Sequence, residues 1–153
     1  MSSLAFLNVV EYISELYAPS MNYERLIKHA QNARAHSHSP FSHFRVGSAV
    51  LTASGKVFTG CNIENSSFGL TICAERTALF KAVSEGHSKF TAIAISTDEE
   101  SPVAPCGACR QVIMDLAGDI DVVMTGKHGA RRVARMSELF PFPFGPGNLL
   151  KRK

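Results

Sequence analysis

The stretch TICAERTALF, Thr71–Phe80, decides the fold because it joins a predicted strand to a predicted helix near the middle of the chain. Its apolar residues recur at helical spacing, which predicts a helix from about Ile72 to Ser84 with Gly86 near its end. The inner side of this helix should carry Ala74, Ala78, Leu79, Ala82 and Val83. Core packing does not explain why the helix opens with a thiol at Cys73 and a carboxylate at Glu75.

Strands and helices alternate on both sides of this stretch. Before it, FRVGSAVLT and KVFTGCNI flank Ala53-Ser54-Gly55 and predict a β-hairpin. After it, FTAIAIST predicts a buried strand, CGACRQVIMDLAG a helix that ends at Gly118, and IDVVMT another strand. RRVAR predicts a last short strand, and MSELF a terminal helical turn. This order predicts an α/β fold, a three-layer α/β/α sandwich with a mixed β-sheet.

A chain of 153 residues without repeats or an internal linker is expected to form one main domain. We expect this domain to span residues 21–153, and residues 1–20 to be an N-terminal extension of unknown role. Residues 4–17 could form a short helix in that extension. The first helix of the domain should place one face inward, with Asn22 as a candidate cap; the residues on that face are Leu26, Ile27, Ala30 and Ala33.

Composition and charge exclude several classes of protein. Hydrophobic residues make up 45% of the chain and charged residues 19%, as in compact globular proteins. No apolar run approaches the roughly 20 residues of a membrane span, and Glu11 interrupts an N-terminus that lacks the basic start of a signal peptide. We therefore expect a cytoplasmic protein. The net charge of +3 is too small and too scattered to predict a nucleic-acid or membrane partner.

The cysteines predict a metal site, because a reducing compartment disfavours disulfides. Cys106 and Cys109 form a C-x-x-C pair at a helix start, and Cys73 has the same kind of position. Two helix N-termini side by side would favour the thiolate forms that bind metal. Three ligands leave a fourth tetrahedral position open, as in catalytic zinc sites. Alternatively, Cys61 closes a structural four-thiolate site, although its place in a strand favours a small core thiol.

Glu75 bears on the choice between a catalytic and a structural site. A glutamate in the first turn of a helix is usually a favourable partner for the helix dipole. Beside an open metal position, the same carboxylate becomes a candidate general acid/base that acts on water.

The segment CNIENSSFGLTICAERTA, followed by PCGACRQV, resembles the zinc-dependent cytidine deaminases, specifically their homotetrameric class. The likeness extends from about Leu26 to Leu149 and includes SPFSHFRVGSAV and LFPFPFGPGNLL. The resemblance implies a cytidine deaminase-like fold in residues 21–153 and an enzyme that uses Zn²⁺. It implies hydrolysis of cytidine and 2′-deoxycytidine to uridine and 2′-deoxyuridine, with release of ammonia, in pyrimidine salvage.

The resemblance also implies a role for individual residues around the metal. Cys73, Cys106 and Cys109 would hold zinc, and Glu75 would shuttle protons between water and the pyrimidine. Arg76 would donate hydrogen bonds to the ligand sulfurs and so withdraw part of their negative charge.

Substrate contacts follow from the same resemblance. Phe44 would stack on the pyrimidine, the backbone at Ala74 would contact it, and Asn62 and Glu64 would hydrogen-bond the ribose. In this class neighbouring subunits complete each pocket, here with Phe68 and Phe144. Many relatives carry Tyr where this chain has Phe68, so a hydroxyl group is absent at that position.

Three other functions compete with this interpretation. A zinc deaminase of another aminopyrimidine, such as a nucleoside antibiotic, would keep the same chemistry. A deaminase of polynucleotides would usually present His in place of Cys73 and would need a basic channel. A zinc-stabilised interaction module without activity would use four zinc ligands and would have no role for Glu75.

Overall fold

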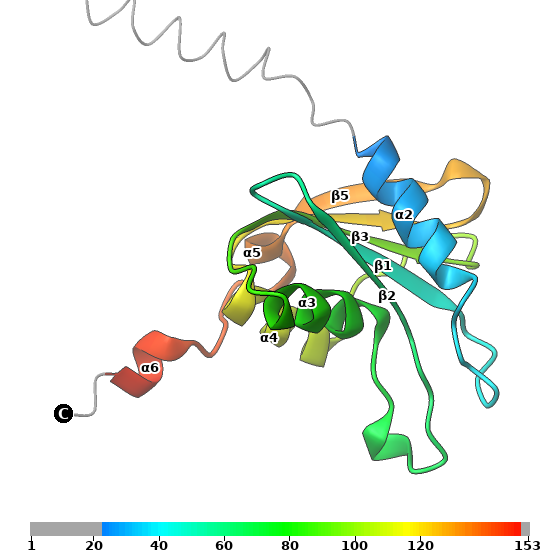
Figure 1. Cartoon of the computed structure of the whole chain (residues 1–153), viewed down its shortest axis with the longest axis horizontal. Coiled ribbons are helices and arrows are strands. Elements are labelled where there is room, and N and C mark those ends of the chain that lie inside the picture. The colour runs from blue at the N-terminus through cyan, green and yellow to red at the C-terminus, as the bar shows by residue number, and fades with distance from the viewer. Residues whose placement is uncertain (1–22, 151–153) are drawn as a thin grey trace, which may run out of the picture.

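The computed structural model describes residues 23–150, which form a five-stranded sheet with helices on both faces (Figure 1). The predicted helix at residues 4–17 and the candidate cap Asn22 lie outside the described residues. None of the helices between residues 23 and 150 is long and apolar enough to cross a membrane.

The sheet has the strand order β2-β1-β3-β4-β5 and is mixed, as predicted. The hairpin strands β1 and β2 are antiparallel, and β1 is also antiparallel to β3. The pair β3 and β4 is parallel, whereas β5 returns antiparallel to β4. The bounds of the strands are β1 Val46–Thr52, β2 Val57–Cys61, β3 Phe90–Thr97, β4 Asp121–Thr125 and β5 Arg131–Arg135.

Helices cover the two faces of the sheet unequally, and together they form the three layers that the sequence predicts (Figure 1). Among the helices within residues 23–150, α2 packs on one face, and α3, α4 and the short α5 pack on the other. A short helix, α6, follows α5 and was not expected from the sequence. The helices are α2 Glu24–Arg34, α3 Ala74–Ser84, α4 Gly107–Leu116, α5 Met136–Leu139 and α6 Pro146–Leu150, with 3₁₀ turns η1 Phe68–Leu70 and η2 Lys127–Gly129.

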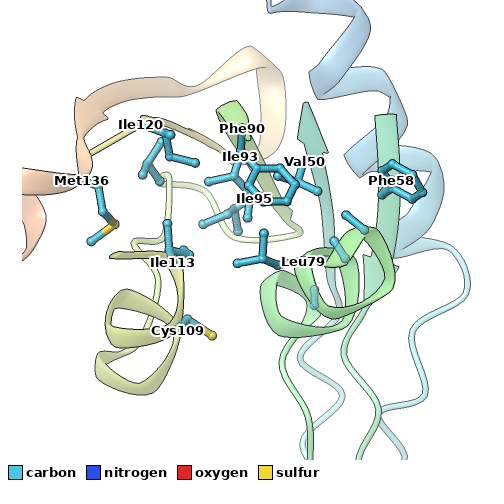
Figure 2. Packing of buried hydrophobic residues seen from close by; sticks show 14 of the residues in the cluster. Val50, Phe58, Leu79, Phe90, Ile93, Ile95, Cys109, Ile113, Ile120 and Met136 are labelled. Carbon is cyan, nitrogen blue, oxygen red and sulfur yellow. The ribbon is translucent and has the colours of Figure 1, made fainter. Parts of the chain in front are cut away.

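The main core lies between the sheet and the helices α3 and α4 (Figure 2). Alternate residues of β3 serve opposite layers, because successive side chains of a strand point to opposite faces. Ile93 and Ile95 pack with Leu79 and Ile113 of the two helices, whereas Ala94 belongs to the α2 side. A strand that is buried on both faces explains the continuous apolar sequence FTAIAIST.

Two details of the predicted helix at Ile72–Ser84 are wrong. Helix α3 begins at Ala74 because Cys73 is an extended N-cap residue, with φ −78° and ψ 154°. Val83 is 40% exposed, since the inner stripe of α3 runs through Ala74, Ala78 and Ala82 and leaves Val83 on the outer side. The face predicted for the first helix is confirmed; its buried residues are Leu26, Ile27, Ala30 and Ala33.

Two glycines bring the helices close to the hairpin. A Cβ atom at Gly60 of β2 would lie 2.4 Å from the backbone nitrogen of Ala78 in α3. A Cβ atom at Gly47 of β1 would lie 2.0 Å from the carbonyl oxygen of Ala30 in α2. Neither distance is compatible with a side chain, so glycine sets how closely each helix approaches the sheet.

Candidate active site

Three thiols converge where the N-termini of α3 and α4 lie together. Cys73 is the N-cap residue of α3, Cys106 is the N-cap residue of α4, and Cys109 lies in the first turn of α4. Their sulfur atoms all lie within 4.8 Å of one another, and those of Cys73 and Cys106 are 3.9 Å apart. Within residues 23–150, these cysteines form the cluster of at least three His, Cys, Asp or Glu side chains whose ligand atoms lie close enough together to hold one metal ion.

The surroundings of the thiols fit a zinc ion. Thiolates are preferred zinc ligands, and three of them leave one tetrahedral position open. The Nη2 of Arg76 donates to the sulfur of Cys73 at 3.4 Å, and the buried Nε of Arg76 has no hydrogen-bond partner. Contact with Cys109, together with the hydrogen bond from Arg76, lowers the pKa of Cys73 to about 5. The contact with Cys73, together with burial, raises the pKa of Cys109.

Cys61 stands apart from this group. Its half-buried thiol donates to the carbonyl oxygen of His36 at 3.3 Å. The interpretation of Cys61 as an apolar core thiol is therefore wrong, because the thiol is partly exposed and bonded to backbone. The alternative of a closed four-thiolate site also fails, since Cys61 does not join the convergent group.

A cavity of about 280 Å³ opens beside the thiols, close to the lower end of the range for small-ligand sites. It brings together most residues singled out in the sequence: Phe44, Asn62, Glu64, Cys73, Ala74, Glu75 and Cys106. Sequence reasoning missed several wall residues: Ser42, Val46, Thr71, Ile72, Ile95, Thr97, Val103 and Ala104. Thr97 carried a usable signal, because it ends the predicted strand FTAIAIST and so lies at the carboxyl edge of the sheet. The neutral residues of the loop before Cys106 carried none.

Glu75 lies in the first turn of α3 and lines the cavity together with Cys73 and Cys106. Only 5% of its surface is exposed. Burial raises the pKa of its carboxyl group, and the negative charge of Cys73 acts in the same direction. A carboxyl group with a raised pKa holds a proton more readily than a surface glutamate does.

Asn62 follows β2 directly and holds the segment that leads into β1. Its Oδ1 accepts from the hydroxyl of Ser37 at 2.5 Å and from the backbone N–H of Val46 at 2.9 Å. Its Nδ2 donates to the carbonyl oxygen of Phe44 at 2.7 Å. A primary amide has two N–H donors, so one N–H of Asn62 is left for a ligand.

Glu64 caps the loop that precedes Phe44. Its carboxylate accepts from the backbone N–H of Phe41 at 2.9 Å, from the backbone N–H of Ser42 at 3.2 Å, and from the Ser42 hydroxyl. The hydroxyl bond contributes most to lowering the pKa of Glu64, and the two backbone bonds add to it. Glu64 therefore stays ionised at the mouth of the cavity and retains capacity to accept from a ligand.

Phe68 and Phe144, in contrast, do not line this cavity. They are 74% and 58% exposed, respectively. Phe68 packs edge-on against Phe41 at a centroid distance of 5.8 Å. Both rings line an open hollow that shares Ser42, Glu64 and Thr71 with the cavity. Phe144 belongs to the C-terminal segment before α6, and its carbonyl oxygen accepts from Gln111 at 2.7 Å.

Three thiols beside a buried carboxyl group in a small cavity define the site of a zinc-dependent hydrolase. The family model described as "Cytidine and deoxycytidylate deaminase zinc-binding region" matches residues 20–126. The chain belongs to this family of zinc-binding deaminases.

Individual relatives agree with this assignment. The chain is 49% identical over 125 residues to a cytidine deaminase of Halalkalibacterium halodurans, covering 81% of this chain and 95% of the relative. It is 45% identical over 130 residues to a probable cytidine deaminase of Dictyostelium discoideum, covering 84% and 88%, respectively. Its structure is similar to that of a cytidine deaminase from Burkholderia pseudomallei, with a TM-score of 0.78, 46% identity, and coverage of 81% of this chain and 100% of the other.

We predict that Cys106→Ala abolishes zinc binding, because two sulfurs cannot hold the ion against chelators, whereas Cys61→Ser retains one zinc per chain. Elemental analysis of both purified variants after dialysis against EDTA measures this difference. Loss of zinc from Cys61→Ser would show that Cys61 supports the metal and would restore the closed-site alternative.

Proposed function

We propose that the chain catalyses the hydrolytic deamination of cytidine and 2′-deoxycytidine, which yields ammonia and uridine or 2′-deoxyuridine. The observation that carries this proposal is the burial of Glu75 in one small cavity with Cys73 and Cys106. Proton transfer by a positioned carboxyl group is what hydrolysis of an amino group from a ring requires. The named relatives support cytidine as the substrate.

In this proposal Cys73, Cys106 and Cys109 hold the zinc ion. When bound, zinc supplies Lewis-acid activation of water, which makes a nucleophile available near neutral pH. Three thiolates outweigh the charge of a divalent ion, so the site carries excess negative charge. Arg76 offsets part of that charge through its hydrogen bond to the Cys73 sulfur.

Glu75 is the residue that moves protons. Its carboxylate takes a proton from the attacking water and delivers it to N3 of the ring, while the water oxygen bonds to C4. The carboxylate then takes the remaining proton from the oxygen that is now bonded to C4 and delivers it to the amino group. As that oxygen becomes the C4 carbonyl, the C4–N4 bond breaks and ammonia leaves, while N3 keeps its proton. Burial raises the pKa of Glu75 and so helps it to hold the proton between these transfers.

Phe44 and Ala74 orient the pyrimidine. The ring of Phe44 borders the cavity and offers a flat apolar face on which the base can stack. Ala74 is the first residue of α3, where backbone N–H groups lack partners within the helix. A base stacked on Phe44 and bonded to the backbone at Ala74 would present its C4 edge toward the cysteines and Glu75.

Asn62 and Glu64 bind the sugar. The remaining N–H of Asn62 can donate to a sugar hydroxyl, and the carboxylate of Glu64 can accept from one. Both side chains are already held in place by the loop at Phe41–Phe44. A sugar therefore meets polar groups that are oriented before it arrives, which reduces the entropy lost on binding.

We further propose that the active form is a homotetramer in which neighbouring subunits close each pocket. Phe68 borders the open hollow next to the cavity, with its ring mostly in solvent. Phe144 belongs to the segment before α6, which leads away from the sheet (Figure 1). Exposed aromatic rings at these places are the kind of surface that association buries. The absence of a hydroxyl at Phe68 leaves this contact apolar.

The cellular setting follows from the chemistry. Free thiols that serve as metal ligands suit a reducing compartment, so we place the protein in the cytoplasm, with a role in pyrimidine salvage. We assign the catalytic function to residues 21–153 as a single domain.

We predict that Glu75→Gln keeps zinc and fold but lowers kcat by at least about 10²–10⁴, because the amide cannot accept and return protons. Glu85→Gln is the matched control, since it makes the same change at the exposed C-terminal end of α3. Loss of absorbance of cytidine in the ultraviolet measures turnover. Near-normal turnover of Glu75→Gln would remove Glu75 from the mechanism.

We predict that the purified protein sediments as a tetramer and that Phe144→Ala lowers kcat/KM, because the pocket loses its cover from a neighbour. Sedimentation equilibrium measures the assembly, and initial rates measure activity in the same samples. A fully active monomer would contradict the shared pocket.

We predict turnover of cytidine and deoxycytidine but little of free cytosine or of a cytosine-containing oligonucleotide. Without the sugar, the buried amide of Asn62 keeps an N–H without a ligand partner, and the contacts from Asn62 and Glu64 that orient C4 are lost. In a polynucleotide, flanking phosphates would approach the ionised Glu64. The test measures kcat/KM for the four substrates under one set of conditions. A value for cytosine equal to that for cytidine would refute the sugar contacts, and a higher value for the oligonucleotide would refute the proposed substrate.

A further inference from the structure

We propose that Arg34, which belongs to the helix on the opposite face of the sheet, is a positioning residue for the substrate pocket. It holds the start of the loop at residues 98–105, which forms one wall of the cavity. The inference extends the proposed function, and its effect on substrate binding rests on that function. The anchoring of the loop can be measured separately.

Arg34 reaches the pocket side of the molecule because α2 lies unusually close to β1. Arg34 is the last residue of α2, and a Cβ atom at Gly47 would lie 2.3 Å from its backbone nitrogen. The helix end therefore rests directly on the β1 backbone. From there the long side chain extends to the end of β3, the next strand of the sheet.

The guanidinium group of Arg34 contacts three consecutive residues. Nη1 donates to the hydroxyl of Ser96 at 3.1 Å and to the carbonyl oxygen of Thr97 at 2.5 Å. Nη2 pairs with the carboxylate of Asp98 at 3.0 Å. A planar guanidinium group has donors in a fixed arrangement, so it can fix three acceptors relative to one another as a lysine ammonium cannot.

These contacts lie where β3 becomes the pocket wall. The side chain of Ser96 points toward the α2 layer, whereas the side chain of Thr97, on the opposite face, lines the cavity. Asp98 begins the loop, and Val103 and Ala104 farther along it line the cavity before Cys106. Fixing the carbonyl of Thr97 and the carboxylate of Asp98 therefore fixes the direction in which the loop leaves the sheet.

At the start of the loop, the backbone N–H of Glu99 also donates to Oγ1 of Thr97 at 3.4 Å, a bond within the segment itself. Contacts with other elements hold the rest of the loop. The backbone N–H of Lys127 donates to the carbonyl oxygen of Glu99 at 2.7 Å. At the far end, Nε of Arg110 donates to the carbonyl oxygen of Pro105 at 2.8 Å, directly before the metal-site residue Cys106. Because that end is held independently, loss of Arg34 should displace the substrate wall and leave the metal site intact.

The experiment compares Arg34→Met and Asp98→Asn with Arg131→Met. Arg131 is the matched control, because it also forms a 3.0 Å ion pair with a carboxylate, Glu24, but at the other end of α2. For both test variants we expect KM for cytidine to rise about tenfold, with kcat within about twofold and zinc at one per chain. Hydrogen exchange of the amides at residues 98–105 should be faster in both than in the wild type and the control.

Each outcome decides the matter. The proposal is overturned if both test variants have the same KM and the same hydrogen-exchange rates as Arg131→Met. It is also overturned if they lose kcat or zinc while KM stays unchanged. If Arg34→Met does not fold, Asp98→Asn decides, because it keeps the contacts of Arg34 to β3 and removes the ion pair to the loop. If the wild type does not turn over cytidine, the proposed function fails, and hydrogen exchange alone tests the anchoring of the loop.

Discussion

The site depends on one constraint: the N-termini of α3 and α4 must lie side by side at one edge of the sheet. Only then do Cys73 and Cys106, each an N-cap residue, come within 3.9 Å of one another. The core enforces this arrangement, because Leu79 and Ile113 bury the two helices against β3 (Figure 2). On the other side, Gly60 lets α3 lie against the backbone of β2. The packing of the two helices against the sheet thus sets the relative positions of the three thiols.

The same arrangement creates an electrostatic conflict that the site resolves locally. Three sulfurs and the carboxyl group of Glu75 lie close together, and Cys109 and Glu75 are buried. Arg76, next to Glu75 in sequence, supplies the positive charge, and the helix N-termini add to it. Burial and the nearby Cys73 raise the pKa of Glu75. The burial of a carboxyl group is unfavourable for folding, but the raised pKa is useful for proton transfer.

Much of this could be predicted from the sequence, because its signals are local. The apolar run FTAIAIST, the turn at Ala53-Ser54-Gly55 and the C-x-x-C pair are each patterns of near neighbours, and they predicted the fold and the thiol group. Predictions that depended on tertiary contacts were less successful. Val83 faces solvent because the packing of α3 selects its inner stripe, and Cys61 bonds to the carbonyl of His36, a partner distant in sequence. The wall residues Val103 and Ala104 have no local signal at all.

Side chains that meet the substrate also hold the protein together. Glu64 accepts hydrogen bonds from Phe41 and Ser42, and Asn62 bonds to Ser37, Phe44 and Val46. Together they hold the segment that carries the ring of Phe44. Arg34 does the same for the opposite wall from the far layer of the sandwich. Because these side chains already hold the loops in place, the pocket is ordered before the substrate binds. The free energy of substrate binding can then serve to orient C4. A substitution of Asn62 or Glu64 therefore changes both the shape of the pocket and its direct contacts with the substrate. A substitution of Arg34, which lies outside the pocket, changes the shape of the pocket without removing a substrate contact.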